Sequence, residues 1–286
     1  MNSAPEVTLT PIHSLDLIRS RGLLVDVLKE LQPQRDALTV VGAHAVLERT
    51  KALEPYLVSD ATRDADLGVT PELLSAEPLL GATLRDLGLE EASQVRPGVW
   101  GLVSERDRDL HDRLTIDLIA PASLAGPGRR AAKVGPHGAR AVSKTAGTEL
   151  TVIDRSIMRV GKLDTSEGVD AYVAGHGALL CAKAYKLFDR LDERERVRNP
   201  ERLRTKDAAD MYRLMATSAP GQVRETFDRG EYEPAIAVAV RTGRERLLVI
   251  REPLVDLAVR HYRGVLPREV VEEAMNEWLD EFGRAN

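Results

Sequence analysis

The sequence predicts an α+β fold, in which a mixed sheet flanked by helices is followed by a mainly helical C-terminal part. Short runs of apolar and β-branched residues mark strands in the first half of the chain, at 38–41, 64–69 and 114–119. From Gly175 onward, apolar residues recur at helical spacing instead. With 286 residues and 43% apolar content, the chain can bury a sizeable core. We therefore expect two domains, 1–173 and 174–286.

The N-terminal elements follow from local patterns. Residues 1–10 are polar and contain proline, so they read as a loose arm. Apolar residues at near-helical spacing predict a packing helix over 14–31, with Ser14 as its N-cap. The strand at 38–41 leads into a helix from His44 to Leu53. A lone histidine in that first helical turn is more often structural than phosphate-binding, and both roles stay open.

The middle of the chain alternates short elements with polar loops. Pro71 and Gly88 are placed to start and end one or two helices. A strand at 95–103 is interrupted by the turn Pro97-Gly98, and the charged stretch 105–113 reads as a solvated hairpin tip. Further strands are expected at 150–160 and 170–173.

Composition excludes several classes of protein. The net charge of −5 does not suit a non-specific nucleic-acid coat, so any nucleic-acid contact has to be local. Cys181 is the only cysteine, which excludes an internal disulfide and a cysteine-rich zinc site. No apolar stretch approaches the length of a membrane span. We therefore expect a cytoplasmic protein without a membrane partner.

Three acidic residues on predicted strands indicate a metal site. Asp64 and Asp66 alternate with apolar residues, and residues two apart in a strand point to the same face. Asp117 lies in another apolar run, where a lone buried carboxylate would be unfavourable. Mg²⁺ is the simplest neutraliser, and it also binds phosphates. With the small-residue turn Gly42-Ala43, these carboxylates predict a site for phosphoryl or nucleotidyl transfer.

The stretch 125–144 is the only sustained basic run in this acidic chain, and it contains no acid. It reads either as a flexible surface loop or as a contact for triphosphate or RNA phosphates. Because it is rich in Gly and Pro and has little to bury, we expect Arg129, Arg130 and Lys133 to matter more for binding than for folding.

A lysine and two acids in the C-terminal half are predicted to face inward. Lys183 borders the apolar stripe of its helix, whereas Lys186 is expected to point well away from it. Asp207 and Asp210 share the apolar face of a helix that Thr205 is expected to cap. We therefore expect Lys183 to pair with an inward acid at the edge of the site.

The turn Gly42-Ala43 and the strand residues Asp64, Asp66 and Asp117 resemble the nucleotidyltransferase superfamily of polymerase-β type. Its pattern is Gly-Gly or Gly-Ser, then Asp-x-Asp, then a later strand Asp. The narrower resemblance, carried by 173–183 and 202–214, is to the AbiEii family of nucleotidyltransferase toxins, to which the mycobacterial MenT toxins are related. Together the motifs span roughly residues 38 to 215. The chain departs from the pattern at Ala43, where many relatives have Ser or Gly, so a hydroxyl contact to phosphate is absent.

The resemblance implies a nucleotidyltransferase fold and Mg²⁺-dependent transfer of a nucleoside monophosphate from an NTP. Asp117 would also act as the base toward the attacking hydroxyl, and Lys183 would contact the triphosphate. The implied metal ligands are Asp64, Asp66 and Asp117. The implied catalytic set adds Lys183 and Asp207 to these ligands, and the nucleotide-binding set is Gly42, Ala43, Lys183, Asp207 and Asp210.

The resemblance also implies an acceptor such as the tRNA 3′ end and a role as the toxin of a toxin–antitoxin system, controlled by a separately encoded antitoxin. Two other interpretations stay open. One is a nucleotidyltransferase with a small acceptor of the aminoglycoside type, which the overall acidity favours slightly. The other is a nucleotide-binding module without catalytic activity.

Overall fold

A mixed eight-stranded sheet forms the centre of the first half of the chain. The computed structural model describes residues 13–54, 56–57, 60–199 and 203–284, so the predicted N-terminal arm lies outside the described residues. The strand order is β3-β4-β5-β2-β1-β8-β7, and β6 pairs with β5. The strands are β1 (Leu38–Val41), β2 (Asp64–Val69), β3 (Leu89–Glu91), β4 (Val99–Leu102), β5 (Thr115–Pro121), β6 (Ser143–Thr145), β7 (Arg155–Gly161) and β8 (Gly168–Ala174).

The sheet is mixed: β1 with β8, β2 with β5 and β5 with β6 are parallel pairs, and the other pairs are antiparallel. The register of β2 and β5 places Asp66 opposite Asp117 and Asp64 opposite Thr115. In the antiparallel pair of β1 and β2, Val41 lies opposite Asp66. The end of β1, from which the next helix begins, therefore lies directly beside the acidic residues.

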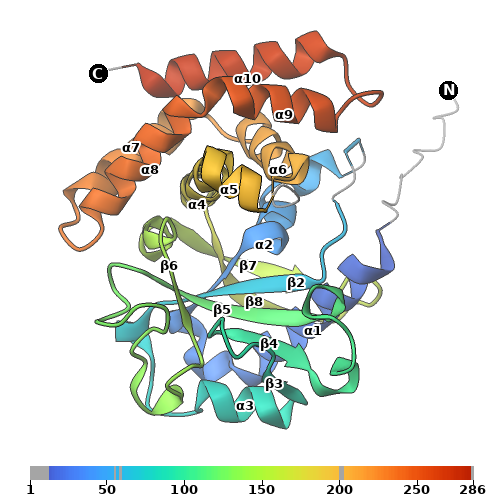
Figure 1. The fold of residues 1–286 in the computed structure, drawn as a ribbon, viewed down its shortest axis with the longest axis vertical. Helices are drawn as coiled ribbons and strands as arrows, with labels where there is room; N and C mark the ends of the chain where they lie inside the picture. Colours follow the sequence, from blue (N-terminus) through green and yellow to red (C-terminus); the bar gives the residue numbers. More distant parts are fainter. Residues whose placement is uncertain (1–12, 55, 58–59, 200–202, 285–286) are drawn as a thin grey trace, which may run out of the picture.

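Helices cover the sheet and build the second half of the chain (Figure 1). This arrangement confirms the predicted α+β fold with a mainly helical C-terminal part. The predicted domain boundary falls at the end of β8. The helices are α1 (Leu15–Glu30), α2 (Gly42–Arg49), α3 (Leu80–Asp86), α4 (His176–Leu191), α5 (Glu193–Arg198), α6 (Thr205–Ala216), α7 (Pro220–Tyr232), α8 (Ala237–Val249), α9 (Arg251–His261) and α10 (Arg268–Gly283).

Local signals set several of these boundaries. The predicted N-cap of α1 is confirmed, because the backbone N–H of Leu17 donates to Ser14 Oγ at 3.2 Å. Helix α2 begins at Gly42, directly after β1, and ends at Arg49, so it starts and stops earlier than predicted. Thr205 is the first residue of α6 and not its cap; its hydroxyl lies 3.1 Å from the Nδ1 atom of His261.

The basic stretch 125–144 is better packed than the sequence suggests. Its small apolar residues are buried, and the buried His137 accepts a hydrogen bond from the backbone N–H of Leu80. Arg129, Arg130 and Lys133 are nevertheless exposed. The expectation that this stretch has little to bury is therefore wrong for its apolar residues. The buried residues are Ala125, Ala132, Val134, His137, Ala141 and Val142.

The charged stretch 105–113 does connect two antiparallel strands, β4 and β5, as a hairpin does. Its two ends are buried, however, and are not solvated. Glu105 accepts a hydrogen bond from the backbone N–H of Leu114, and Arg113 donates to the carbonyl of Leu102 at 2.9 Å. The charged composition of the stretch did not reveal these contacts, because each depends on a specific backbone partner elsewhere in the fold.

Buried polar contacts attach α6 to the first half of the chain. Arg213 donates to Thr50 Oγ1 at 3.0 Å and forms an ion pair with Glu54, and all three side chains are buried. Lys206 donates to the carbonyl of Ala61 at 2.7 Å, just before β2. The C-terminal helices therefore face the acidic residues of β2 across a shared cleft. Among the described residues, no helix is long and apolar enough to cross a membrane.

Candidate active site

Three carboxylates lie together on one face of two paired strands. Ala65 and Leu67 are fully buried in the core, so Asp64 and Asp66 point to the opposite face, toward the cleft. Asp117 is directly opposite Asp66 in the parallel pair. The predicted face of β2 is therefore confirmed, and the register of β5 adds the third carboxylate to the same place.

The three carboxyl groups differ in their ionisation. Burial, and then the charge of Asp64, raises the pKa of Asp66 to about 6. Burial, and then the charges of Asp66 and Asp64, raises the pKa of Asp117 to about 7. Burial also acts to raise the pKa of Asp64, but the hydrogen bond from Thr62 and nearby lysine charges lower it overall. Negative charge therefore accumulates at Asp66 and Asp117 without sufficient compensation.

This electrostatic arrangement predicts that the metal-free protein loses stability as the pH rises. Asp66 and Asp117 bind protons more tightly in the folded protein than in the unfolded chain, so their protonated forms stabilise the fold. This stabilisation is fully present below about pH 4 and is lost as the pH rises through about 7. We expect the free energy of unfolding to fall across this window, by about 1.4 kcal/mol per pKa unit. Urea denaturation in EDTA at several pH values measures it. Asp117→Asn should flatten the slope, and an equally steep slope in that variant would contradict the assignment.

Gly42 brings the main chain against these carboxylates. Its φ of +64° lies in the left-handed region that favours glycine, and a Cβ atom there would lie 2.0 Å from Asp66 Oδ2. Only a residue without a side chain therefore fits between the end of β1 and Asp66. The turn leaves the first backbone N–H groups of α2 beside the acidic residues, as the Gly42-Ala43 motif predicts.

Gly42→Ala tests this close approach. The left-handed conformation alone costs about 1 kcal/mol for alanine, and Asp66 would also have to move. We expect a loss of unfolding free energy of about 1–2 kcal/mol, with weaker binding of metal and nucleotide because the carboxylate is displaced. Chemical denaturation and a binding titration measure the two effects. Gly88→Ala, which has a similar φ of +77° but nothing within 4 Å of the added Cβ, is the control for backbone strain alone.

Basic residues of α4 form the opposite wall of the cleft. Lys183 is 6% exposed, and its Nζ atom lies 2.6 Å from Asp210 Oδ2 and 3.5 Å from Asp207 Oδ1. The predicted inward orientation and pairing of Lys183 are thus confirmed. Burial acts to lower the pKa of Lys183, but the charges of Asp210 and Asp207 raise it above its ordinary value. Lys183 therefore stays charged.

The helical stripe predicted that Lys186 points away from the site, and this prediction is wrong. Its Nζ atom lies 3.0 Å from Asp207 Oδ1, and Arg190 forms an ion pair with the other oxygen of Asp207. Residues three and four apart are neighbours on a helix surface, and a long lysine stem reaches around that surface. Burial acts to raise the pKa of Asp207, but the charges of Lys183, Lys186 and Arg190 hold it well below its usual range.

Two adjoining cavities, of about 1330 Å³ and about 920 Å³, meet at this wall and the carboxylates. Ala43, Asp207 and Asp210 line only the smaller one, whereas Arg129, Arg130 and Lys144 line only the larger one. Together they are large enough for a nucleotide and part of a second substrate. The residues lining both are Gly42, Asp64, Asp66, Arg96, Val99, Asp117, Lys183, Lys186 and Arg190.

The carboxylates fit a divalent cation. Asp117 Oδ1 is buried and has no hydrogen-bond partner, which is unfavourable unless another ligand satisfies it. The oxygens of Asp64, Asp66 and Asp117 do not all lie within 4.8 Å of one another. The three carboxylates need not all reach one ion, because a two-metal site holds two ions about 3.5–4 Å apart and shares the ligands between them. These residues therefore suit Mg²⁺, which prefers oxygen ligands.

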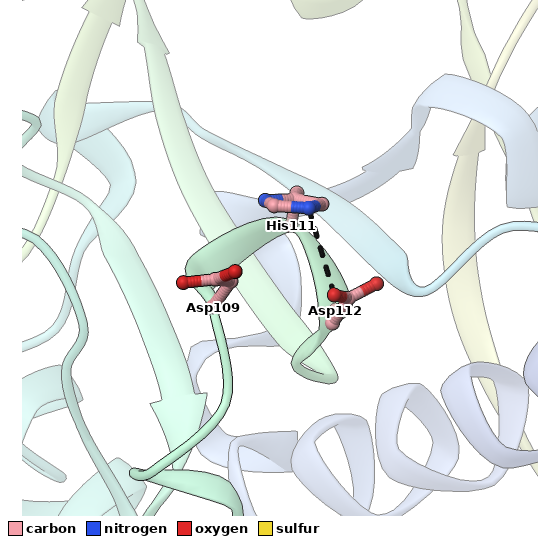
Figure 2. A group of neighbouring side chains, drawn as sticks. All are labelled: Asp109, His111 and Asp112. Atoms are coloured by element: carbon pink, nitrogen blue, oxygen red, sulfur yellow. Dashed lines mark ion pairs between the residues drawn. The ribbon is translucent and has the colours of Figure 1, made fainter.

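Within the described ranges, one cluster of three potential metal-binding side chains has its ligand atoms all within 4.8 Å of one another. It consists of Asp109, His111 and Asp112 (Figure 2). All three side chains are exposed or half-buried at the surface, and His111 Nε2 lies 3.5 Å from Asp112 Oδ2. Asp112 also pairs with Arg63 at 3.0 Å. Because this carboxylate already has a cation, we assign the group no metal.

His44, the other candidate from the sequence, is structural. It is fully buried, and its Nε2 atom lies 3.2 Å from Ser20 Oγ. Burial and the charge of Arg21 lower the pKa of His44 well below its ordinary value, so the ring is neutral. A neutral, enclosed ring does not bind phosphate.

Sequence reasoning missed three basic residues that line both cavities: Arg96, Lys186 and Arg190. The last two follow Lys183 by three and seven positions, a spacing that marks one helix face and that could have revealed them. Arg96 gave no comparable signal. Comparisons with protein-family models, curated proteins and solved structures found no match to this chain.

Proposed function

We propose that this protein is a Mg²⁺-dependent nucleotidyltransferase, which moves a nucleoside monophosphate from an NTP to an acceptor hydroxyl. The observation that carries the proposal is the register of β2 and β5, which sets Asp66 opposite Asp117 beside the left-handed Gly42. Lys183 and Lys186 face this acidic floor across the cleft. An acidic floor suits metal ions, and a basic wall suits the phosphates that accompany them.

Each residue has a distinct role in the proposed reaction. Asp64, Asp66 and Asp117 would hold Mg²⁺, which when bound polarises the attacking oxygen and neutralises charge on the phosphates. Asp117 would also accept the proton of the acceptor hydroxyl, because it lines both cavities at the point where they meet. The acceptor oxygen then bonds to the α-phosphorus, the bond to the leaving pyrophosphate breaks, and pyrophosphate departs.

The nucleotide would lie between α2 and α4. Backbone N–H groups at Gly42 and Ala43 are placed to donate to phosphate oxygens, where the helix N-terminus favours negative charge. Lys183 and Lys186 supply positive charge from the facing wall. Asp207 and Asp210 hold Lys183 in place at 3.5 and 2.6 Å, so they position the lysine instead of binding phosphate directly. Purified protein incubated with labelled NTPs and Mg²⁺ tests the activity.

We further propose an RNA acceptor. Arg129, Arg130 and Lys144 line the larger cavity but not the smaller one, and such residues make the phosphate contacts that position nucleic acid. The resemblance to AbiEii toxins favours the tRNA 3′ end and control by an antitoxin. Adding total RNA to the labelled reaction separates the alternatives. Label on RNA supports this proposal, label only on a small acceptor supports an antibiotic-type enzyme, and binding without pyrophosphate release supports a non-catalytic module.

Replacing Arg129 and Arg130 with Ala should weaken RNA binding while leaving the melting temperature nearly unchanged, because both side chains are exposed. Loss of two phosphate contacts should reduce the slope of log affinity against log salt by about 1.4 for a single strand. RNA titrations at several salt concentrations measure this slope. Lys133→Ala is the matched control, since Lys133 is exposed in the same stretch but does not line the cavity. Equal losses from both changes would contradict a specific contact.

A further inference from the structure

Arg96 lies where the acidic floor meets both cavities. Its guanidinium is 3.4 Å from Asp117 Oδ2, and it lines the larger and the smaller cavity. In the described part of the chain, no other basic side chain forms an ion pair with Asp64, Asp66 or Asp117. Arg96 is therefore the only direct counter-ion of the three carboxylates there.

The backbone beside Arg96 is fixed to the strand that carries Asp117. Gly98 adopts a φ of +79°, its N–H donates to the carbonyl of Arg140 at 2.9 Å, and its carbonyl accepts from the N–H of Leu118 at 2.8 Å. A Cβ atom at Gly98 would lie 2.4 Å from the carbonyl oxygen of Leu118. This close attachment holds the turn against β5, so the root of the Arg96 side chain stays next to Asp117.

The guanidinium itself is held loosely. The side chain of Arg96 is 63% exposed, and that of Asp117 is 15% exposed. Because the Arg96 partner of this pair is well exposed, water screens the pair and the guanidinium exchanges readily. Arginine also has a long, flexible stem and five donors that match phosphate oxygens. The pair is therefore close enough to neutralise Asp117 and weak enough to be displaced.

We propose that Arg96 is the counter-ion of Asp117 in the metal-free centre and transfers to the phosphates of the nucleotide when a divalent cation replaces it on Asp117. This inference rests on the proposed function, because it requires Asp117 to be a metal ligand. The guanidinium and the cation compete for the same carboxylate, and the released guanidinium has the phosphate-sized space of both cavities within reach. Arg96 thereby couples the binding of the metal to the binding of the triphosphate.

The coupling predicts opposite effects of Arg96→Gln on two ligands. Without the competing guanidinium, Mn²⁺ alone should bind about two- to fivefold more tightly, as expected for loss of a surface ion pair. The signal of free Mn²⁺ in electron paramagnetic resonance measures this affinity. Magnesium tripolyphosphate, which probes phosphate contacts without choosing a base, should bind about tenfold more weakly because one charge-assisted contact is lost. Calorimetric titration measures the second affinity.

Arg129→Gln is the matched control, because Arg129 lines the larger cavity and is exposed but forms no ion pair with the three carboxylates. It reports the general effect of removing one positive charge. If the two variants change Mn²⁺ affinity equally, or if Arg96→Gln leaves it unchanged or weaker, the proposed exchange is overturned. Both variants should stay folded, since neither side chain is buried, and Arg96→Gln should melt only slightly lower because it loses one partly exposed ion pair.

Asp117→Asn separates this inference from the function on which it rests. If the parent binds Mn²⁺ and Asp117→Asn weakens that binding strongly, the metal site is supported, and the Arg96 results then decide the exchange alone. If Asp117→Asn binds Mn²⁺ as tightly as the parent, Asp117 is not a ligand, and both the metal site and the exchange are overturned. An increase in Mn²⁺ affinity in Arg96→Gln beyond that in Arg129→Gln supports the exchange.

Discussion

Asp66→Asn is expected to reduce nucleotidyl transfer by several orders of magnitude and to leave the metal-free protein as stable as the parent, or more stable. Asp66 lies opposite Asp117 in the parallel strand pair, so two like charges are forced together when no cation is bound. Asparagine keeps the size and shape of the side chain but removes one of these charges. The repulsion therefore falls, while the ability to hold a cation is lost.

The second consequence of Asp66→Asn concerns ligand-induced stability. Mg²⁺ with an NTP should stabilise the parent by about 2.7 kcal/mol at a concentration near 100 Kd, because these ligands bind only the folded state. The variant should gain almost none of this. Thermal melts of both proteins, with and without Mg²⁺ and NTP, measure the difference beside a transfer assay with labelled NTP. The stability of the metal-free variant is the control for correct folding.

A structural role for Asp66 predicts the reverse result. If Asp66 were held by a basic partner, asparagine would destabilise the protein and leave much of its activity. The nearest candidate in sequence, Arg63, is paired with Asp16 and Asp112 instead, at 3.0 Å in each case. A stable and fully active Asp66→Asn variant would refute the metal site altogether.

The strands that carry the carboxylates could be predicted because their signal is local. Alternation of Asp64, Ala65 and Asp66 fixes which face each side chain takes, whatever the neighbours are. The pairing of Asp66 with Asp117 could not be predicted, because it depends on which strands become neighbours and in which register. Local periodicity therefore predicted the face on which Asp64 and Asp66 lie, and the sheet topology placed Asp117 beside them.

The basic side of the cleft was harder to predict. The prediction that Lys186 points away from the site was wrong because helical spacing gives the direction of the Cα–Cβ bond. It does not give the position of the charged group at the end of a long side chain. Arg96 reaches Asp117 only because the turn at Gly98 is attached to β5. In the stretch 125–144, small apolar residues are buried in the core and alternate with exposed basic residues. The overall composition of the stretch does not distinguish the buried positions from the exposed ones.

Lys183→Met is the second change with a large expected effect. Asp210 has Lys183 as its only ion-pair partner among the described residues, so the change leaves a buried carboxylate uncompensated. Breaking a buried pair in this way costs about 3–5 kcal/mol of unfolding free energy. Lys186→Met should cost less than about 1 kcal/mol, because Lys186 is half exposed and Asp207 keeps Lys183 and Arg190. Chemical denaturation measures both values.

The sequence predicted that only Lys183 faces the site. Because both lysines line the cleft, we expect both replacements to lower transfer. The double variant Lys183→Met/Asp210→Asn separates stability from function. Asparagine removes the uncompensated charge, so most of the lost stability should return. Transfer should stay low, since the charge facing the triphosphate is still missing. A double variant that regained both stability and activity would show that Lys183 serves only to neutralise Asp210, and the nucleotide contact would then have to come from Lys186 and Arg190.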